Sequence, residues 1–103
     1  MASLNPEIMH IVLFKWIDEA TPEAIQQAVH ALLDLKNKVP GILEISCGAN
    51  FSDRGQGFTH GLVVRLTDRA ALDAYGPHPA HQKVVVKHIN PIRADVLVLD
   101  YEL

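Results

Sequence analysis

Apolar and polar positions along the chain follow two periods, one typical of strands and one typical of helices. Residues 8–17, IMHIVLFKWI, are dense in β-branched and aromatic side chains, which favours a strand. Thr21 and Pro22 then supply a helix N-cap followed by proline at the first helical position. Beyond them, until about Lys38, apolar residues recur at helical spacing: Ile25, Ala28, Val29, Leu32 and Leu35. The sequence therefore predicts a strand followed by a helix.

The pattern continues in the same way to the C-terminus. Pro40 and Gly41 end the first helix, and the polar residues 52–57 separate two further apolar segments. The remaining predicted elements are strands at 42–50, 58–66 and 94–101, a short helix from Asp68 to about Tyr75, and a helix from Pro79 to about Asn90. The order is β-α-β-β-α-β, which predicts an α+β fold of the ferredoxin-like type in a single domain spanning residues 1–103.

Both faces of the predicted sheet are apolar. The first strand places Ile8, His10, Val12, Phe14 and Trp16 on one face, and Met9, Ile11, Leu13 and Ile17 on the other. The last strand likewise places Val96 and Val98 on one face, and Leu97, Leu99 and Tyr101 on the other. Because two helices cover only one face of a sheet, the second face needs a partner. We therefore expect a homodimer in which two sheets meet, with these side chains buried between the subunits: Met9, Ile11, Leu13, Leu97 and Leu99.

Composition narrows the classes of function. Hydrophobic residues make up 49% of the 103 residues, enough for a core, and the net charge is -3 without a basic run, which argues against nucleic-acid binding. No apolar run approaches the ~20 residues that span a bilayer, and the first residues do not resemble a signal peptide. The single cysteine, Cys47, leaves no intrachain disulfide and no cysteine-based zinc site. We expect a cytoplasmic protein without a membrane or nucleic-acid partner.

Several polar residues lie on apolar faces of the predicted elements. His10, His60 and Asp100 lie on the helix-facing side of the strands, and a helical stripe carries His81, Val84, Val85 and His88. Tyr75 precedes the break at Gly76-Pro77, and His78 caps the helix that follows. A single buried histidine is more often structural than functional, but several titratable groups converging on one apolar recess favour binding or chemistry. His30 and His88 are expected to be ordinary surface or rim residues.

Two kinds of chemistry fit these groups. In the first, Asp100 orients His81 as a base, and the Tyr75 phenol donates a hydrogen bond to a carbonyl or a developing oxyanion. In the second, His78 and His81 bind a metal ion together with His10 or His60, although Pro79 and the cap geometry are expected to turn the two imidazoles apart. We favour the first and expect no metal and no cofactor. A Cys47 nucleophile is disfavoured because no base lies beside it in the sequence.

Four short motifs resemble the stress-responsive A/B-barrel family, the dimeric α+β-barrel proteins. They are HIVLFK at 10–15, GFTH at 57–60, HPAH at 78–81 and VLDY at 98–101. The resemblance implies a ferredoxin-like unit that pairs into a dimeric barrel. A plant polyketide cyclase of this family works without a cofactor, and the resemblance implies catalytic roles for Tyr75 and His81, with Asp100 nearby and His10 and His60 in the pocket. Other members resemble stable, stress-associated oligomers without an established reaction. The sequence departs from that cyclase at Gly76-Pro77 and through 82–90.

The sequence therefore predicts a pocket for a small apolar carbonyl compound, with cyclase- or isomerase-like chemistry. The predicted catalytic residues are Tyr75, His81 and Asp100, with one ring nitrogen of His81 bonded to Asp100 directly or through one water. The predicted substrate-binding residues are His10, Val12, Phe14, His60, Leu62, His78, Val84 and Val85. The alternative is a stress-associated structural or ligand-binding oligomer without turnover. An enzyme requires an open cavity that reaches both Tyr75 and His81.

Overall fold

The computed structural model describes residues 5–103, so the first four residues of the predicted domain lie outside the described residues. Its elements are β1 (Ile8–Trp16), α1 (Pro22–Asp34), a 3₁₀ turn η1 (Leu35–Asn37), β2 (Ile42–Ala49), β3 (His60–Leu66), α2 (Arg69–Tyr75), α3 (Pro79–Val84), a π-helical turn η2 (Val85–Ile89) and β4 (Arg93–Glu102). Every predicted strand and helix is present, and most boundaries agree within about two residues. The α+β prediction is confirmed.

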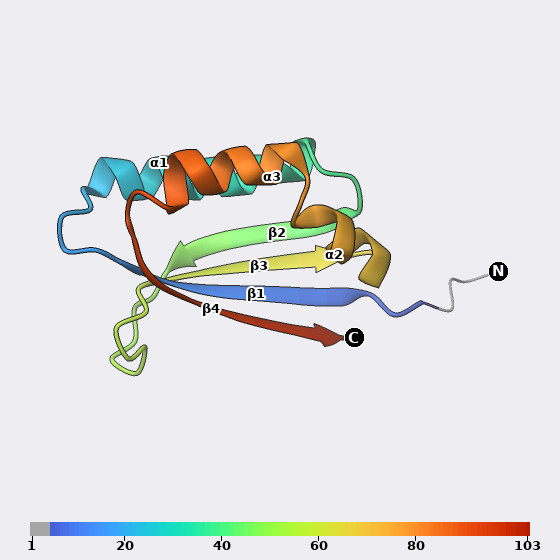
Figure 1. The fold of residues 1–103 in the computed structure, drawn as a ribbon. Helices are drawn as coiled ribbons and strands as arrows, with labels where there is room; N and C mark the ends of the chain where they lie inside the picture. Colours follow the sequence, from blue (N-terminus) through green and yellow to red (C-terminus); the bar gives the residue numbers. More distant parts are fainter. Residues whose placement is uncertain (1–4) are drawn as a thin grey trace.

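The strands form one antiparallel sheet in the order β2-β3-β1-β4. Both crossover connections place their helices on the same side, so Figure 1 shows a helical layer above a sheet whose other face is open. This is the ferredoxin-like arrangement that the element order predicts. It puts β1 and β3 at the centre of the sheet and β4 at an edge, beside β1.

The helix starts follow from local side-chain chemistry. The Thr21 hydroxyl accepts a hydrogen bond from the Ala24 amide at 3.1 Å, and the Asp68 carboxylate accepts one from the Ala71 amide at 2.8 Å. The His78 Nδ1 atom does the same for the Ala80 amide at 3.0 Å, ahead of α3. Each cap satisfies one of the amide groups that a helix N-terminus leaves unpaired. His78 therefore acts as the N-cap of α3, as the sequence predicts.

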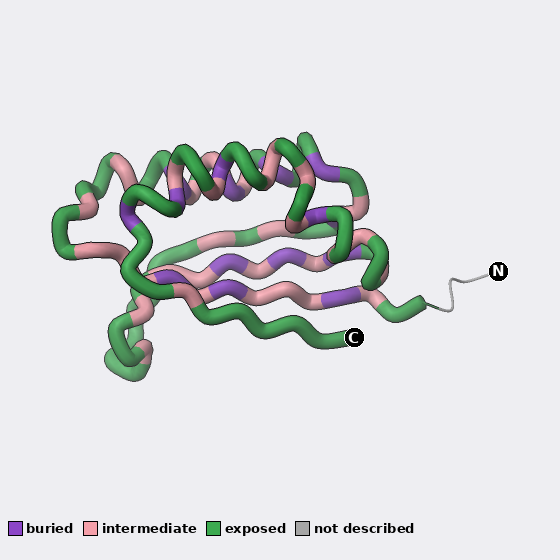
Figure 2. The backbone as a smooth tube through the Cα atoms, in the orientation of Figure 1, coloured by how far each residue is buried: buried purple, intermediate pink, exposed green. Residues whose placement is uncertain are grey.

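The core lies between the helical layer and the sheet. Its most completely buried large side chains are Tyr75, Leu35, Leu62, Leu66 and Val64. Figure 2 shows that most of the buried stretches of the sheet lie in β1 and β3, whereas β4 is largely exposed. Ile17 follows the end of β1 and packs against this core, so its predicted place on the open face is wrong.

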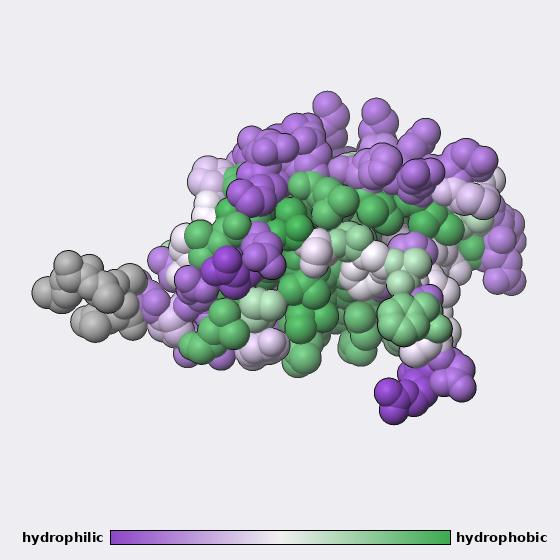
Figure 3. All heavy atoms as spheres, turned by 180° about the vertical axis from the view of Figure 1, so that it is seen from behind, coloured by the Kyte–Doolittle hydropathy of each residue, from purple (hydrophilic) through white to green (hydrophobic). Residues whose placement is uncertain are grey.

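The face of the sheet opposite the helices remains apolar and uncovered in the single chain. Met9, Ile11 and Leu13 are only half-buried. Leu97 and Leu99 on β4 retain 53% and 59% exposure. Figure 3 shows hydrophilic side chains over the helical layer and apolar side chains gathered on the sheet layer below it. The β2–β3 loop extends away from the helices, beyond this open face (Figure 1), and presents a fully exposed Phe51.

Within residues 5–103, no helix combines the length and the apolar character that crossing a bilayer requires.

Candidate functional site

A cavity of about 200 Å³ lies between the sheet and the helices. Its walls come from β1, β3, β4, α1 and the segment from α2 to η2. The lining residues are His10, Val12, Phe14, Leu32, Leu62, Tyr75, His81, Val85, Ile89, Arg93, Val96 and Val98. Most of them are apolar, and the polar groups are two imidazoles, one phenol and one guanidinium. The cavity reaches both Tyr75 and His81, which is the arrangement that the enzyme hypothesis requires.

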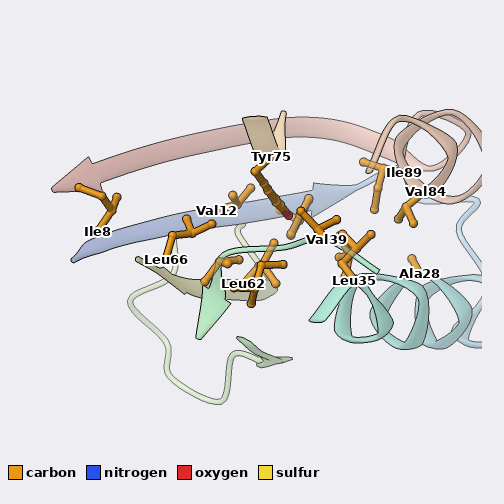
Figure 4. Packing of buried hydrophobic residues seen from close by; sticks show 14 of the residues in the cluster. Ile8, Val12, Ala28, Leu35, Val39, Leu62, Leu66, Tyr75, Val84 and Ile89 are labelled. Atoms are coloured by element: carbon orange, nitrogen blue, oxygen red, sulfur yellow. The ribbon is translucent and has the colours of Figure 1, made fainter. Parts of the chain in front are cut away.

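Tyr75 ends α2 and is the most unusual group in this cavity. The residue is only 1% exposed, and its hydroxyl has no hydrogen-bond partner among the described residues. Figure 4 shows the ring reaching from α2 into the buried apolar cluster, with the hydroxyl oxygen at its inner end. Burial raises the pKa of Tyr75 to about 12, so the phenol stays protonated at neutral pH. It is a hydrogen-bond donor without an acceptor.

His81 lies in the first turn of α3 and packs against that phenol ring. The two ring centroids are 4.5 Å apart. The His81 Nδ1 atom lies 2.8 Å from the Gly76 carbonyl oxygen, so the partner assigns the proton to Nδ1. Burial lowers the pKa of His81, and the neighbouring His10 and His78 lower it further, against the opposing effect of the Gly76 bond. A neutral imidazole results, and its Nε2 lone pair has no partner among the described residues.

Asp100 holds His10 rather than His81. The two residues are directly opposite each other in the antiparallel pairing of β1 and β4, and Nδ1 of His10 lies 2.5 Å from the Asp100 carboxylate. The predicted direct contact between His81 and Asp100 is therefore wrong, because the sheet register gives Asp100 a nearer imidazole and the Gly76 carbonyl occupies Nδ1 of His81. The His10 ring centroid lies 5.5 Å from that of Tyr75, so this pair belongs to the same cavity.

The remaining predicted binding residues divide into two groups. Val12, Phe14, Leu62 and Val85 line the cavity as expected. His60, His78 and Val84 do not, which corrects their predicted grouping with it. His60 accepts a hydrogen bond from the Trp16 indole at 3.0 Å, His78 caps α3, and Val84 is buried on the side of α3 that lies towards α1.

Some cavity residues escaped the sequence analysis. Leu32, Val96 and Val98 were recognisable as inward-facing apolar positions, so their periodicity was the available signal. Ile89 lines the cavity through the π-helical turn η2, in which the Asn90 amide donates to the Val85 carbonyl at 2.8 Å. Such turns occur often at functional sites, and this one brings Val85 and Ile89 to the same wall. No helical periodicity in the sequence marks it.

Histidine, cysteine and carboxylate side chains do not gather in groups of three or more suited to a metal ion anywhere in residues 5–103. The described part of the chain therefore offers no ligand set for the metal site that was considered at His78 and His81.

The bond between His10 and Asp100 should give a spectroscopic signature. A short bond from a ring N–H to a carboxylate deshields the proton. We expect a strongly downfield His10 Nδ1–H resonance in ¹H NMR spectra of the wild type and its loss in Asp100→Ala. The variant should remain folded, because Asp100 is exposed at an edge strand. A downfield resonance that persists in Asp100→Ala would contradict the assignment.

The fold and this cavity together define a small ferredoxin-like α+β protein with an internal cavity. The chain belongs to the stress-responsive A/B barrel domain family, whose model matches residues 8–103. It is 32% identical to a stress-response A/B barrel domain-containing protein of Arabidopsis thaliana over 98% of this chain, but it spans only 40% of the length of that plant protein.

Solved structures give the same fold. A dimeric ferredoxin-like protein of unknown function from Thermobifida fusca is 27% identical, with a TM-score of 0.85 over 100% of this chain and 96% of that one. A dimeric ferredoxin-like protein of unknown function from Jannaschia is 30% identical, with a TM-score of 0.79 over 94% of this chain and 99% of that one. Both similar proteins are described as dimers.

Proposed function

We propose that this chain is a single-domain, homodimeric enzyme that performs cofactor-independent acid–base chemistry on a small carbonyl compound bound in the cavity. The observation that supports this most strongly is the buried Tyr75 hydroxyl, which has no partner among the described residues and belongs to a ring that packs against the neutral His81 ring. An unpaired buried hydroxyl destabilises the folded protein by about 1–3 kcal/mol, and a bound ligand that accepts its hydrogen bond would remove this penalty.

Tyr75 acts as the donor in this proposal. A phenol with a pKa of about 12 remains protonated and does not compete as a base. It donates to the carbonyl oxygen of the ligand and strengthens that bond as negative charge develops on the oxygen. The apolar walls favour this because charge-assisted hydrogen bonds are stronger where water is excluded.

His81 acts as the base. Its Nδ1 proton is held by the Gly76 carbonyl, which leaves the Nε2 lone pair to accept a proton. The C–H bond beside the ligand carbonyl breaks, an N–H bond forms at Nε2, and the electron pair moves to the carbonyl oxygen held by Tyr75. The same N–H group then returns the proton to another atom of the ligand, which restores the neutral His81 ring, while His10, fixed by Asp100, lines the cavity beside Tyr75. Isomerase or aldol cyclase chemistry needs these steps.

The dimer is part of the proposal. The uncovered sheet face carries half-buried and exposed apolar side chains on β1 and β4, and two related structures are described as dimers. A second copy of the same face would bury these side chains around a two-fold axis. The proposal also retains the cytoplasmic location that the sequence predicts.

Proton exchange provides the experiment, because it needs no knowledge of the natural substrate. Phenylacetone carries a carbonyl and acidic neighbouring C–H bonds on a benzene-sized body. We expect the wild type to accelerate exchange of these protons in deuterated water at least ~100-fold over free imidazole at equal concentration, as general-base catalysis implies. The loss of their ¹H NMR signal measures the exchange rate. The rate should stay level through neutral pH and fall only below the ordinary histidine pKa of ~6.5, because burial lowers the pKa of His81 and protonation removes its lone pair.

The matched variants are His81→Gln and His30→Gln, since His30 is exposed on α1 and lies outside the cavity. His81→Gln should return exchange to the background rate, and His30→Gln should leave it unchanged. Equal exchange by wild type and His81→Gln would contradict the proposed base. Binding of phenylacetone without any exchange would instead support the non-catalytic, ligand-binding alternative.

A further inference from the structure

Arg93 reaches the cavity because of an irregularity in the sheet. The pairing of β1 with β4 places Lys15 opposite Asp95 but Trp16 opposite Arg93, so Ala94 is an extra residue on β4. Such a bulge re-aims the side chains that precede it. Simple alternation from Val96 would put Arg93 on the open face, whereas the bulge puts it on the face of Trp16, where it lines the cavity.

The Arg93 guanidinium has no partner there. It makes no hydrogen bond or ion pair with any other residue in 5–103. Arg65 and Arg69 provide a contrast, since each is bonded to a glutamate, Glu7 and Glu102 respectively. Arg93 is exposed, so it lies at the solvent side of the cavity, whereas Tyr75 lies deep inside. The cavity therefore has a cationic end and a phenol at its inner end.

No acidic side chain of the described residues lines this cavity to balance the guanidinium. Apart from Arg93, its polar lining consists of His10, Tyr75 and His81. The nearby Asp100 carboxylate is bonded to His10 and is absent from the lining. A planar guanidinium with free N–H groups beside apolar walls fits a planar carboxylate, which it binds through two parallel hydrogen bonds.

The size of the cavity limits the rest of the ligand. An apolar cavity of ~150 Å³ holds a benzene molecule, so about 200 Å³ leaves room for a ring or a branched alkyl group of similar size with a short substituent. The walls that would contact this body are Val12, Phe14, Leu32, Leu62, Val85 and Ile89.

We propose that Arg93 binds the carboxylate of the ligand, so that the substrate class is a short carbonyl acid whose apolar body fills the cavity. The inference rests on the proposed function, because it assigns the ligand of the same site. The carboxylate lies at Arg93 at the mouth, and the carbonyl oxygen lies further in, towards the Tyr75 hydroxyl. Arg93 is thus a specificity-determining residue and takes no part in proton transfer.

Two probes of nearly equal size test this directly. Phenylacetate carries the carboxylate, and phenylacetamide is its neutral counterpart. We expect the wild type to bind phenylacetate about tenfold or more tightly than phenylacetamide by calorimetry at low salt, as a charge-assisted contact implies. Arg93→Gln should remove that preference by weakening only phenylacetate. Lys36→Gln makes the same change of net charge at an exposed residue outside the cavity and should keep the preference.

The outcomes separate the two proposals. Equal affinity of the wild type for both probes, or an undiminished preference in Arg93→Gln, would overturn the role of Arg93 while the cavity itself still binds ligand. NMR of the His10 and His81 rings reports occupancy independently. If neither probe moves these resonances in any variant, the cavity is not a ligand site, and the proposed function fails together with this inference. Partial recovery of phenylacetate affinity in Arg93→Lys would support it further.

Discussion

Replacing Tyr75 with phenylalanine should stabilise the ligand-free protein by about 1 kcal/mol and should weaken the binding of a carbonyl ligand. The Tyr75 hydroxyl is buried and has no partner in the described residues, so its removal deletes an unsatisfied donor and leaves the ring packing in place. Urea unfolding of wild type and Tyr75→Phe, compared at equal protein concentration, measures the difference.

Tyr75→Ala is the matched comparison for that measurement. It removes the ring as well, leaves a cavity in the core, and should destabilise the protein by about 3–5 kcal/mol. The contrast separates the packing of the ring from the cost of the hydroxyl. A loss of more than ~1 kcal/mol in Tyr75→Phe would mean that the hydroxyl has a structural partner, and the ligand-binding role would then lose its main support.

Placing a charge on the open face of the sheet should dissociate the dimer. Leu97 projects from β4 on the uncovered face, and a two-fold axis would bring its counterpart into the same interface. Because burial of an unpaired carboxylate costs several kcal/mol and Leu97→Glu introduces it twice, we expect the dissociation constant to rise ~1,000-fold or more. Light scattering coupled to size exclusion reports the molar mass.

Val86→Glu is the control for this variant. Val86 is 64% exposed, but it lies in η2 in the helical layer, on the other side of the sheet from the expected interface. It should remain a dimer at the same concentration. An unchanged dimer in Leu97→Glu would show that the open face is not the contact between subunits.

The fold was predictable because its determinants are local. Thr21-Pro22, Asp68 and His78-Pro79 mark helix starts within the sequence itself, and the dense apolar strands allow few other arrangements. The boundary errors occur where the backbone is irregular. The predicted helix from Pro79 to Asn90 changes to a π-type turn after Val84, which depends on packing against the sheet rather than on residue type.

The sequence predicts which polar residues lie at the site, but it does not predict which of them bond to each other. Periodicity places His10, Tyr75, His81 and Asp100 in one region, and the cavity contains or borders all of them. Which imidazole meets Asp100 depends on the register between β1 and β4, and the face pattern alone does not choose between registers that differ by two residues. Arg93 was missed for the same kind of reason, because a bulge reverses the face that alternation assigns to it.

Binding of a labelled carbonyl compound shows whether the Tyr75 hydroxyl donates a hydrogen bond to a ligand in the cavity. Phenylacetone enriched with ¹³C at the carbonyl carbon would be titrated with wild type and with Tyr75→Phe and followed by ¹³C NMR. We expect a downfield shift of the bound carbonyl resonance in the wild type, because the donated hydrogen bond polarises the carbonyl, and no such shift in Tyr75→Phe. An identical bound resonance in both proteins would contradict this hydrogen bond.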